Sequence, residues 1–353
     1  MSPVPDNLLP LPGTDSAGRL IIAGPCAAES RGQVLQMARV ALDAGAGAFR
    51  AGVWKPRTHP GGFEGMGESA LDWLAEAKAA TGLPVATEVA TRAHVEAALA
   101  AGIDILWIGA RTAANPFAVQ EIADAIAACA APPAVLVKNP VSPDIELWIG
   151  ALQRIHTAGV RRLGAIHRGF TTLGESVYRN APHWSIPFEL RRRVPGLPVI
   201  CDPSHICGRA DLVADVAMRA MDMHFDGLII ESHPEPAKAL SDAAQQLTPD
   251  MLRKLLASLP ARSTPAADPE LEELRRLIDE ADTELLDLLA RRMEIARRIG
   301  ELKHRSGMSV VQPHRYRQLI ESRKAAGAAL GLSPDFMQTI LEAIHEESVR
   351  QQL

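Results

Sequence analysis

The sequence predicts a (β/α)8 TIM barrel followed by a small all-α domain. Before residue 258, eight short apolar runs alternate with amphipathic stretches, and several of these stretches end in glycine as a helix C-cap does. Strands that are apolar throughout are buried on both faces, which is typical of a parallel sheet covered by helices. Eight such units in about 250 residues match a closed barrel. After residue 270 the apolar residues recur with helical spacing only.

The apolar runs give the expected strands in chain order. They are 20–24, 48–54, 84–89, 104–110, 134–140, 162–167, 198–204 and 225–231. A doubly wound open sheet is the alternative, but it usually has fewer strands, and the sequence has no GxGxxG or GxxxxGK[ST] loop. Residues 259–269 contain three prolines and no apolar periodicity, so we expect a linker there between a barrel domain (1–258) and a helical domain (270–353).

The helical domain begins with a heptad pattern. Its positions, spaced alternately by four and three, are 274, 278, 281, 285, 288, 292, 295, 299 and 302. All are apolar except Arg292, which as a structural residue would set the register or extend to solvent. A helix of about 35 residues is about 50 Å long and cannot bury such a seam within so small a domain. We therefore expect a homodimer, or a larger assembly, through this domain. Two more helices are expected at 313–327 and 334–352, the second with Ser333 as N-cap.

Composition excludes several classes of function. The 37 basic and 42 acidic residues give a net charge of −5 without blocks of like charge, which argues against nucleic acid or an anionic membrane as partner. The longest nearly apolar run, 125–137, is too short to span a bilayer, and the N-terminus has no signal-peptide pattern. The four cysteines form no disulfide framework. A cytoplasmic globular protein is expected.

Charged and metal-ligating residues gather at the carboxyl ends of the expected strands, where barrel enzymes carry their chemistry. One such cation is ordinarily a solvated loop residue, but six in an acidic protein imply a polyanionic ligand, such as phosphate with carboxylate. They are Arg50, Lys55, Arg57, Arg111, Lys138 and Arg168. Cys26, His205, Glu231 and Asp242 could together hold a divalent transition metal. Spacing alone does not exclude that Cys26 is a buried core residue and that His205 has only a structural role.

Seven segments of the barrel resemble 3-deoxy-D-arabino-heptulosonate 7-phosphate (DAHP) synthase of type I beta. They are GPCAAES (24–30), FRAGVWKPRT (49–58), IGARTAANPF (108–117), VLVKNP (135–140), AIHRGF (165–170), CDPSHICG (201–208) and IIESHPEPAKALSDAAQQL (229–247). The resemblance implies a metal-dependent condensation of phosphoenolpyruvate with D-erythrose 4-phosphate, which opens the shikimate pathway of aromatic amino-acid biosynthesis.

The same resemblance implies roles for individual residues. The metal ligands would be Cys26, His205, Glu231 and Asp242, holding one Mn2+, Fe2+, Co2+ or Zn2+ ion per barrel. The phosphoenolpyruvate site would comprise Arg111, Lys138 and Arg168, with Arg50 and the catalytic Lys55 beside them. Arg57 and Thr58 would bind erythrose 4-phosphate, while Glu88 and His167 would order water or move a proton.

A related family is the alternative for the barrel. The 3-deoxy-D-manno-octulosonate 8-phosphate synthases share the fold and the phosphoenolpyruvate chemistry, but typically have a KANR-type segment where this chain has KPRT (55–58). The KPRT segment therefore favours erythrose 4-phosphate.

The helical domain is similar to the AroQ class of chorismate mutase, which rearranges chorismate to prephenate. LEELRRLIDEADTELLDLLARRMEIARRIGELK (271–303) resembles its long first helix and EESVRQQ (346–352) its C-terminal signature. The resemblance implies substrate binding by Arg275, Arg292, Lys303, Arg315, Ser348 and Gln352, of which Arg292, Lys303 and Gln352 are catalytic.

Two further features of this helical domain concern its assembly and its departures from the family pattern. Arg275 and Arg292 are 17 residues apart, about 25 Å along a helix, so Arg275 is expected to serve the partner's site in an intertwined dimer. Gln312 and Tyr316 stand where many members of the class have acidic residues, although Tyr316 could offer its phenol instead.

The sequence thus predicts a bifunctional enzyme in which prephenate or chorismate, bound to the helical domain, inhibits the synthase. The alternative is a synthase whose helical domain serves only for regulation and dimerisation.

Overall fold

The structure, a computed structural model, describes residues 7–56, 61–171, 176–260, 269–309 and 313–352. The chain forms two compact units, Met1–Arg262 and Ser263–Leu353. Each unit is described by itself.

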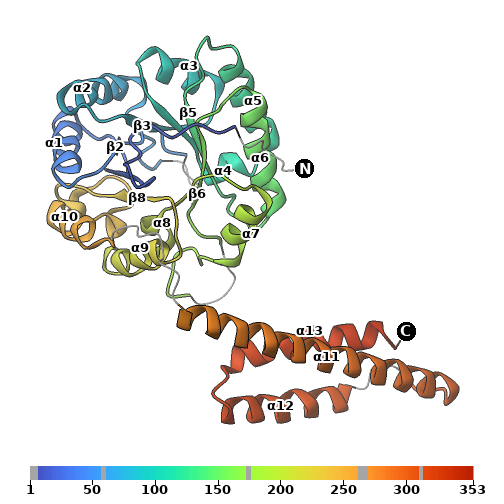
Figure 1. Cartoon of the computed structure of the whole chain (residues 1–353). Helices are drawn as coiled ribbons and strands as arrows, with labels where there is room; N and C mark the ends of the chain where they lie inside the picture. The colour runs from blue at the N-terminus through green and yellow to red at the C-terminus, as the bar shows by residue number, and fades with distance from the viewer. Residues whose placement is uncertain (1–6, 57–60, 172–175, 261–268, 310–312, 353) are drawn as a thin grey trace. The chain divides into compact units, whose positions relative to one another are not determined.

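The first unit is a closed barrel of eight parallel strands in sequence order, with β1 paired to β8 (Figure 1). The strands are β1 (Leu20–Gly24), β2 (Ala48–Arg50), β3 (Val85–Val89), β4 (Ile105–Ile108), β5 (Ala134–Lys138), β6 (Leu163–His167), β7 (Val199–Cys201) and β8 (Gly227–Glu231). Each lies within one of the eight apolar runs, and the predicted barrel is confirmed.

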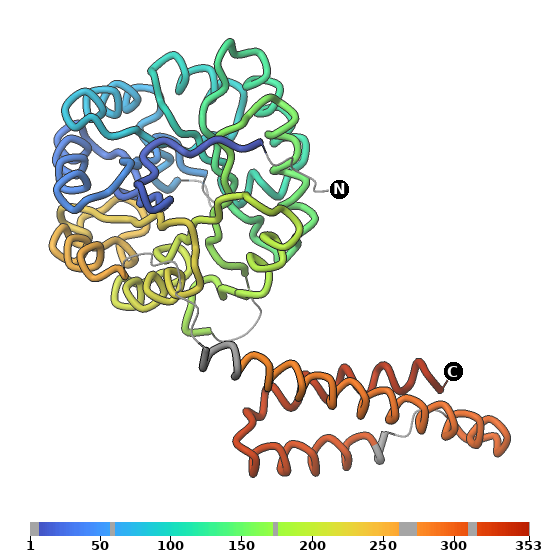
Figure 2. Tube along the Cα trace, viewed as in Figure 1, coloured from blue at the N-terminus to red at the C-terminus, as the bar shows by residue number. Residues whose placement is uncertain are grey.

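Helices surround the barrel, as the trace in Figure 2 shows. They are α1 (Arg31–Asp43), α2 (Leu71–Thr81), α3 (Arg92–Ala100), α4 (Ala110–Ala113), α5 (Pro116–Ala127), α6 (Ile145–Thr157), α7 (Ser185–Arg193), α8 (Pro203–Cys207), α9 (Val213–Asp222) and α10 (Pro249–Ser258). Short 3-10 turns lie at Gly67–Ala70, Ala210–Leu212, Pro236–Lys238 and Ala243–Gln245. The Ser30, Thr91 and Asn115 side chains cap the first backbone N–H groups of α1, α3 and α5, as their sequence positions favour.

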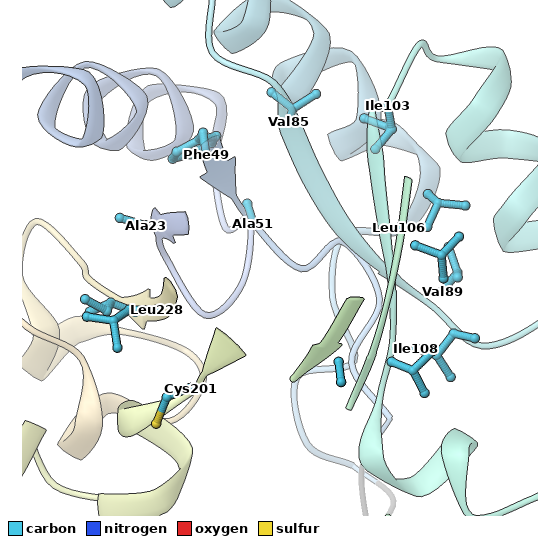
Figure 3. Close-up of a cluster of buried hydrophobic side chains, with 14 of the residues drawn as sticks. Ala23, Phe49, Ala51, Val85, Val89, Ile103, Leu106, Ile108, Cys201 and Leu228 are labelled. Carbon is cyan, nitrogen blue, oxygen red and sulfur yellow. The ribbon is translucent and has the colours of Figure 1, made fainter. Parts of the chain in front are cut away.

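The strands alternate between two apolar cores, because successive side chains point to opposite faces. The inner core contains Leu20, Ile22, Ala48, Ala86, Ile105, Trp107, Ala134, Leu136, Ile166, Ile200 and Ile229, with Leu11 from the N-terminal segment. Their neighbours along the strands, such as Phe49, Leu106 and Leu228, belong to the outer core beneath the helices (Figure 3). A residue two positions after an inner-core residue therefore also points inward.

The second unit contains three helices, α11 (Pro269–Arg305), α12 (Pro313–Ala329) and α13 (Pro334–Arg350). The Ser333 hydroxyl accepts a hydrogen bond from the Phe336 N–H, so it caps α13 as predicted. The unit leaves the leucines and isoleucines of its heptad seam exposed by 41–62%; they are Leu274, Ile278, Leu285, Leu288, Ile295, Ile299 and Leu302. Across the described residues, we find no helix with the length and apolar character that crossing a membrane requires.

Candidate active sites of the barrel and the helical unit

A cavity of about 500 Å³ lies at the carboxyl ends of the strands. Its lining includes ionisable side chains from the carboxyl ends of several strands and from the segments that follow them. These are Lys55, Glu88, Arg111, Lys138, Arg168, Arg179, His205 and Asp242. Barrel enzymes carry their active sites at this end of the fold, so the cavity is the candidate active site of the first unit.

The four predicted metal ligands come together beside this cavity. Ligand atoms of Cys26, Glu231 and Asp242 all lie within 4.8 Å of one another, and the Cys26 Sγ is 3.4 Å from the Asp242 Oδ2. His205 joins them, since its Nε2 is 3.8 Å from the Glu231 Oε1. Cys26 follows β1, His205 lies in α8, Glu231 ends β8, and Asp242 lies in the loop after β8 in a left-handed conformation. Barrel closure between β1 and β8 thus brings Cys26 beside Glu231.

The ionisation of these donors suits a divalent transition metal. Burial, reinforced by the charge of Glu231, raises the pKa of the Cys26 thiol to about 12. Burial would also raise the pKa of Glu231, but the charges of His205, Arg50 and Lys55 outweigh it and hold that pKa below its usual value. A cation at this point would favour the thiolate, and one thiolate, one imidazole and two carboxylates fit a borderline metal such as Mn2+, Fe2+, Co2+ or Zn2+.

Arg50 is placed differently from the other predicted cations. Its side chain is 1% exposed, lies 4.8 Å from the centre of the Trp107 ring, and donates from Nη2 to the Glu231 Oε1 at 3.0 Å. The same Nη2 donates to the Cys26 carbonyl at 3.3 Å. Arg50 therefore orients two of the metal donors from beneath them.

The other predicted cations that the structure describes line the cavity. Lys138 ends β5, Arg111 lies in α4, Arg168 follows β6, and Lys55 lies in the loop after β2. Burial lowers the pKa of Arg168 to about 10, and the charges of Arg179 and Arg111 add to the effect. Like charges held this close favour an anion between them. Arg57 and Thr58 lie outside the described residues.

Two charged residues that hold the site together had not been predicted. Asp202 is fully buried and caps α8, and its Oδ2 lies 2.8 Å from the Lys138 Nζ and 2.9 Å from the His205 Nδ1. Arg179 donates from Nη1 to the Asp242 Oδ1 at 3.1 Å and to the Gln245 Oε1 at 3.0 Å. Asp202 could have been found, because an Asp followed by Pro at a strand end signals an N-cap. Arg179 lies in a loop without a pattern.

Of the two predicted proton-transfer residues, only Glu88 faces the cavity. The Glu88 Oε2 accepts from the Trp107 indole N–H at 3.0 Å, and a Cβ at Gly109 would lie 2.1 Å from the Glu88 Oε1, so glycine makes room for the carboxylate. His167 points away into the outer core, where Trp148, Phe170, Trp184 and Phe225 surround its ring.

The prediction that His167 orders water or moves a proton is wrong. Burial lowers its pKa to about 3, and the ring lies on the face of β6 opposite to the cavity. It follows the outward-facing Ala165 by two positions, whereas its neighbour Arg168 follows the inward-facing Ile166.

In the helical unit, α11 and α13 bring four predicted residues together. Arg292 donates to the Ser348 hydroxyl, and the Lys303 Nζ donates to the Gln352 Oε1 at 3.0 Å. The helices approach closely at Gly300, where a Cβ would lie 2.7 Å from the Gln352 Cα. These contacts place two cations and two hydrogen-bonding groups on one face of the helix pair.

Among the other predicted residues of the helical unit, the structure describes the side chains of Arg275 and Tyr316. Arg275 is exposed near the start of α11, 17 residues before Arg292 on one continuous helix. The side chain of Arg315 and all of Gln312 lie outside the description. The Tyr316 ring lies against the His345 ring in a tilted arrangement, with 4.2 Å between ring centres. Sequence reasoning missed His345, whose pKa is lowered by burial and by the charges of Arg292 and Lys303.

The geometry agrees with known proteins. The model of the DAHP synthetase I family matches residues 11–263. The chain belongs to the DAHP synthetase I family. The phospho-2-dehydro-3-deoxyheptonate aldolase of Thermotoga maritima is 34% identical over 236 residues, 67% of each chain. A crystal structure of DAHP synthase from the same organism aligns with a TM-score of 0.61 and 32% identity over 68% of each chain.

The chain is also similar to an enzyme that is named for a different product. The 2-dehydro-3-deoxyphosphooctonate aldolase of Syntrophotalea carbinolica is 30% identical to this DAHP synthetase I chain over 261 residues, covering 68% of the chain and 89% of that protein.

The helical unit matches a second family. The model of chorismate mutase type II covers residues 274–353. The 4-amino-4-deoxychorismate mutase of Streptomyces pristinaespiralis is 36% identical over 94 residues, which cover 73% of that protein. The chain is therefore a DAHP synthetase I domain fused to a chorismate mutase type II domain.

Proposed function

We propose that the barrel condenses phosphoenolpyruvate with D-erythrose 4-phosphate to DAHP and phosphate, and that the helical unit rearranges chorismate to prephenate. The observation that carries the first activity is a cluster of metal donors beside a cavity that is lined by cations. The domain bounds that we propose are 1–258 for the synthase, 259–269 for the linker and 270–353 for the mutase.

In the synthase, Lys138, Arg168 and Arg111 would hold the phosphate and the carboxylate of phosphoenolpyruvate. Lys55, beside the donor cluster, would stabilise negative charge that develops as the enol carbon attacks the aldehyde. Arg57 and Thr58 would hold the phosphate of erythrose 4-phosphate. Glu88 faces the same cavity and would orient the water that adds to the phosphoenolpyruvate carbon.

Cys26, His205, Glu231 and Asp242 would hold the divalent metal. When bound, the metal supplies a Lewis acid for the aldehyde oxygen. Arg50 and Gln245 keep the Glu231 carboxylate in place, with hydrogen bonds of 3.0 and 2.7 Å. Fixed supporting contacts of this kind orient ligands and raise metal affinity.

The aldose substrate is the point on which the related octulosonate synthases differ. We propose erythrose 4-phosphate because of the KPRT segment and the higher identity to a heptonate aldolase than to the octonate aldolase. The test follows phosphoenolpyruvate consumption with erythrose 4-phosphate and, separately, with arabinose 5-phosphate. Turnover of arabinose 5-phosphate alone would replace the proposal by the octulosonate reaction.

In the mutase, the reaction is a single pericyclic rearrangement, so the protein needs only to hold the substrate and stabilise charge. Arg292 would bind one carboxylate, and the partner subunit's Arg275 the other, in the compact conformer. Lys303 and Gln352 would hydrogen-bond the ether oxygen as it gains negative charge. Arg315 and Ser348 would complete the site. The exposed heptad seam supports the homodimer that this arrangement requires.

We also propose that prephenate or chorismate, bound to the helical unit, inhibits the synthase in a cytoplasmic enzyme of aromatic amino-acid biosynthesis. Synthase kinetics with added prephenate test the regulation, and an unchanged rate at saturating prephenate would refute it. A helical unit that only regulates and dimerises is the second candidate, favoured by Tyr316 in place of an acidic residue. Chorismate consumption by the full chain separates the two.

A further inference from the structure

One buried carboxylate contacts both halves of the synthase site. Asp202 is fully buried, and a single oxygen, Oδ2, lies 2.8 Å from the Lys138 Nζ and 2.9 Å from the His205 Nδ1. Its other oxygen, Oδ1, accepts from the backbone N–H of His205 at 3.1 Å and so fixes the start of α8. The carboxylate thus has one partner among the cations that line the cavity and one in the donor cluster.

The orientation of His205 makes this contact consequential. Its Nδ1 faces Asp202, while its Nε2 faces the Glu231 Oε1 and the other donors. The charge of the Asp202 carboxylate, 2.9 Å from Nδ1, favours the imidazole tautomer that carries its proton on Nδ1. That tautomer keeps the lone pair of Nε2 for a metal, and the nearby carboxylate makes the lone pair more basic. How strongly Asp202 acts on His205 depends on how much of its charge is already neutralised by Lys138.

Lys138 and His205 compete for the charge of Asp202, so the effect also runs from the donor cluster to the cavity. Lys138 is 4% exposed, lines the cavity, and has the Asp202 carboxylate as its ion-pair partner. An anion in the cavity draws the ammonium charge of Lys138 toward itself and leaves more of the Asp202 charge for His205. A cation on His205 draws the Asp202 charge toward the imidazole and leaves Lys138 more positive toward the cavity.

We infer that Asp202 is a positioning residue that couples the two sites, so that a divalent cation and phosphoenolpyruvate each strengthen the binding of the other. The inference rests on the proposed synthase function, because it assigns Lys138 to the substrate anion. Coupling of this kind is reciprocal, so either ligand can be titrated in the presence of the other. Direct attraction between the two bound ligands adds a part that does not pass through Asp202.

The experiment titrates the metal-free full chain with Co2+ and follows the thiolate-to-cobalt absorption, without and with saturating phosphoenolpyruvate. In the wild type we expect phosphoenolpyruvate to lower the apparent Co2+ dissociation constant by about tenfold or more. In Asp202→Asn the factor is expected to fall to about threefold or less. The ratio of the two constants is the readout, since a merely structural defect weakens Co2+ binding equally with and without phosphoenolpyruvate.

The matched control is Asp104→Asn, which neutralises another lysine-paired carboxylate, 2.7 Å from Lys78 and just before β4. This variant should keep the wild-type ratio of the Co2+ dissociation constants measured without and with phosphoenolpyruvate. The same factor in Asp202→Asn and the wild type would overturn the inference, and so would a wild-type factor near one, which needs no variant to fold. Synthase turnover at saturating Co2+ is measured alongside: turnover without coupling refutes only the inference, whereas no turnover and no phosphoenolpyruvate binding refute the proposed function.

Discussion

The barrel and the helical unit each bring four predicted residues together, but in the described part of the chain only the barrel has buried side chains that hold these residues from within a closed core. In the barrel, the donors converge from the loops around a closed sheet, and buried groups such as Arg50 and Asp202 hold them from below. In the helical unit, Arg292 and Lys303 reach Ser348 and Gln352 between two helices whose apolar seam remains exposed. A closed fold can build a site within one chain, whereas we propose that the site beside the open seam is completed by a second chain.

Metal removal should produce the largest difference between the activity of the barrel and that of the helical unit. Chelation is expected to lower the synthase rate by about a thousandfold or more, because Lewis-acid stabilisation is worth several kcal/mol and each 1.4 kcal/mol is about tenfold. The mutase rate should not change, since its proposed residues are cations and amides. Paired assays with chelator, then with Mn2+ restored, check this. Equal loss of both activities would contradict the assignment of the metal to the barrel.

Arg292→Ala tests the helical unit in the same way. Loss of a charge that binds a substrate carboxylate in the transition state should lower the mutase rate by about a hundredfold to a thousandfold, with the synthase unaffected. The measurement is chorismate absorbance. Arg291→Ala is the control, because it removes the exposed neighbouring arginine of the same helix. A full mutase rate in Arg292→Ala would leave the helical unit without its proposed site.

Leu285→Asp addresses the open seam. If the seam packs against a second copy, burying an unpaired carboxylate there should weaken dimerisation by about tenfold or more. The mutase rate should fall with it, because Arg275 would no longer reach the partner's site. Sedimentation equilibrium measures the change. Leu330→Asp, the same substitution at an exposed leucine outside the seam, should leave the dimer intact. A monomeric wild type would refute the proposed assembly.

His167→Phe concerns the barrel alone and should have the smallest effect. Because the pKa of His167 is lowered from 6.5 to about 3, the unfolded chain binds a proton that the folded barrel does not between these pH values. The wild type should therefore keep its stability above pH 6.5 and lose about 1.4 kcal/mol per pH unit below it through this group. Phenylalanine suits the surrounding aromatic rings and removes the titration.

Urea unfolding followed by tryptophan fluorescence between pH 4.5 and 7.5 measures this difference, since all five tryptophans lie in the barrel. The two proteins should have parallel stability profiles above pH 7 and diverge below pH 6.5. Parallel profiles over the whole range would show that folding does not lower the pKa of His167.

The barrel itself could be predicted from sequence because its strands of three to five residues lie in eight apolar runs that alternate with helical patterns. Arg50, Glu88, Lys138 and Glu231 all follow an inner-core residue by two positions and point inward for that reason. The same rule separates His167 from Arg168, although both stand at the end of β6. Applying only the position along the strand, without its face, led to the wrong assignment of His167.

Contacts between loops could not be predicted in this way. Arg179 reaches Asp242 across 63 residues of sequence, and Gln245 reaches Glu231 from the turn that follows Asp242. Neither loop has a repeating pattern, so side-chain directions depend on the folded path of the chain. Likewise, the heptad pattern predicts that α11 has an apolar seam but does not specify which surface covers it.

The pairing of β1 with β8 also has a consequence for synthesis. Cys26 and Asp242 are 216 residues apart, and Cys26 meets Glu231 only after the last strand has closed the ring. A nascent chain on the ribosome therefore exposes the thiol long before the carboxylates that complete its cluster exist. Metal capture by the proposed centre would therefore be a late event of translation, and a prematurely terminated chain would lack that centre however well its earlier strands had paired.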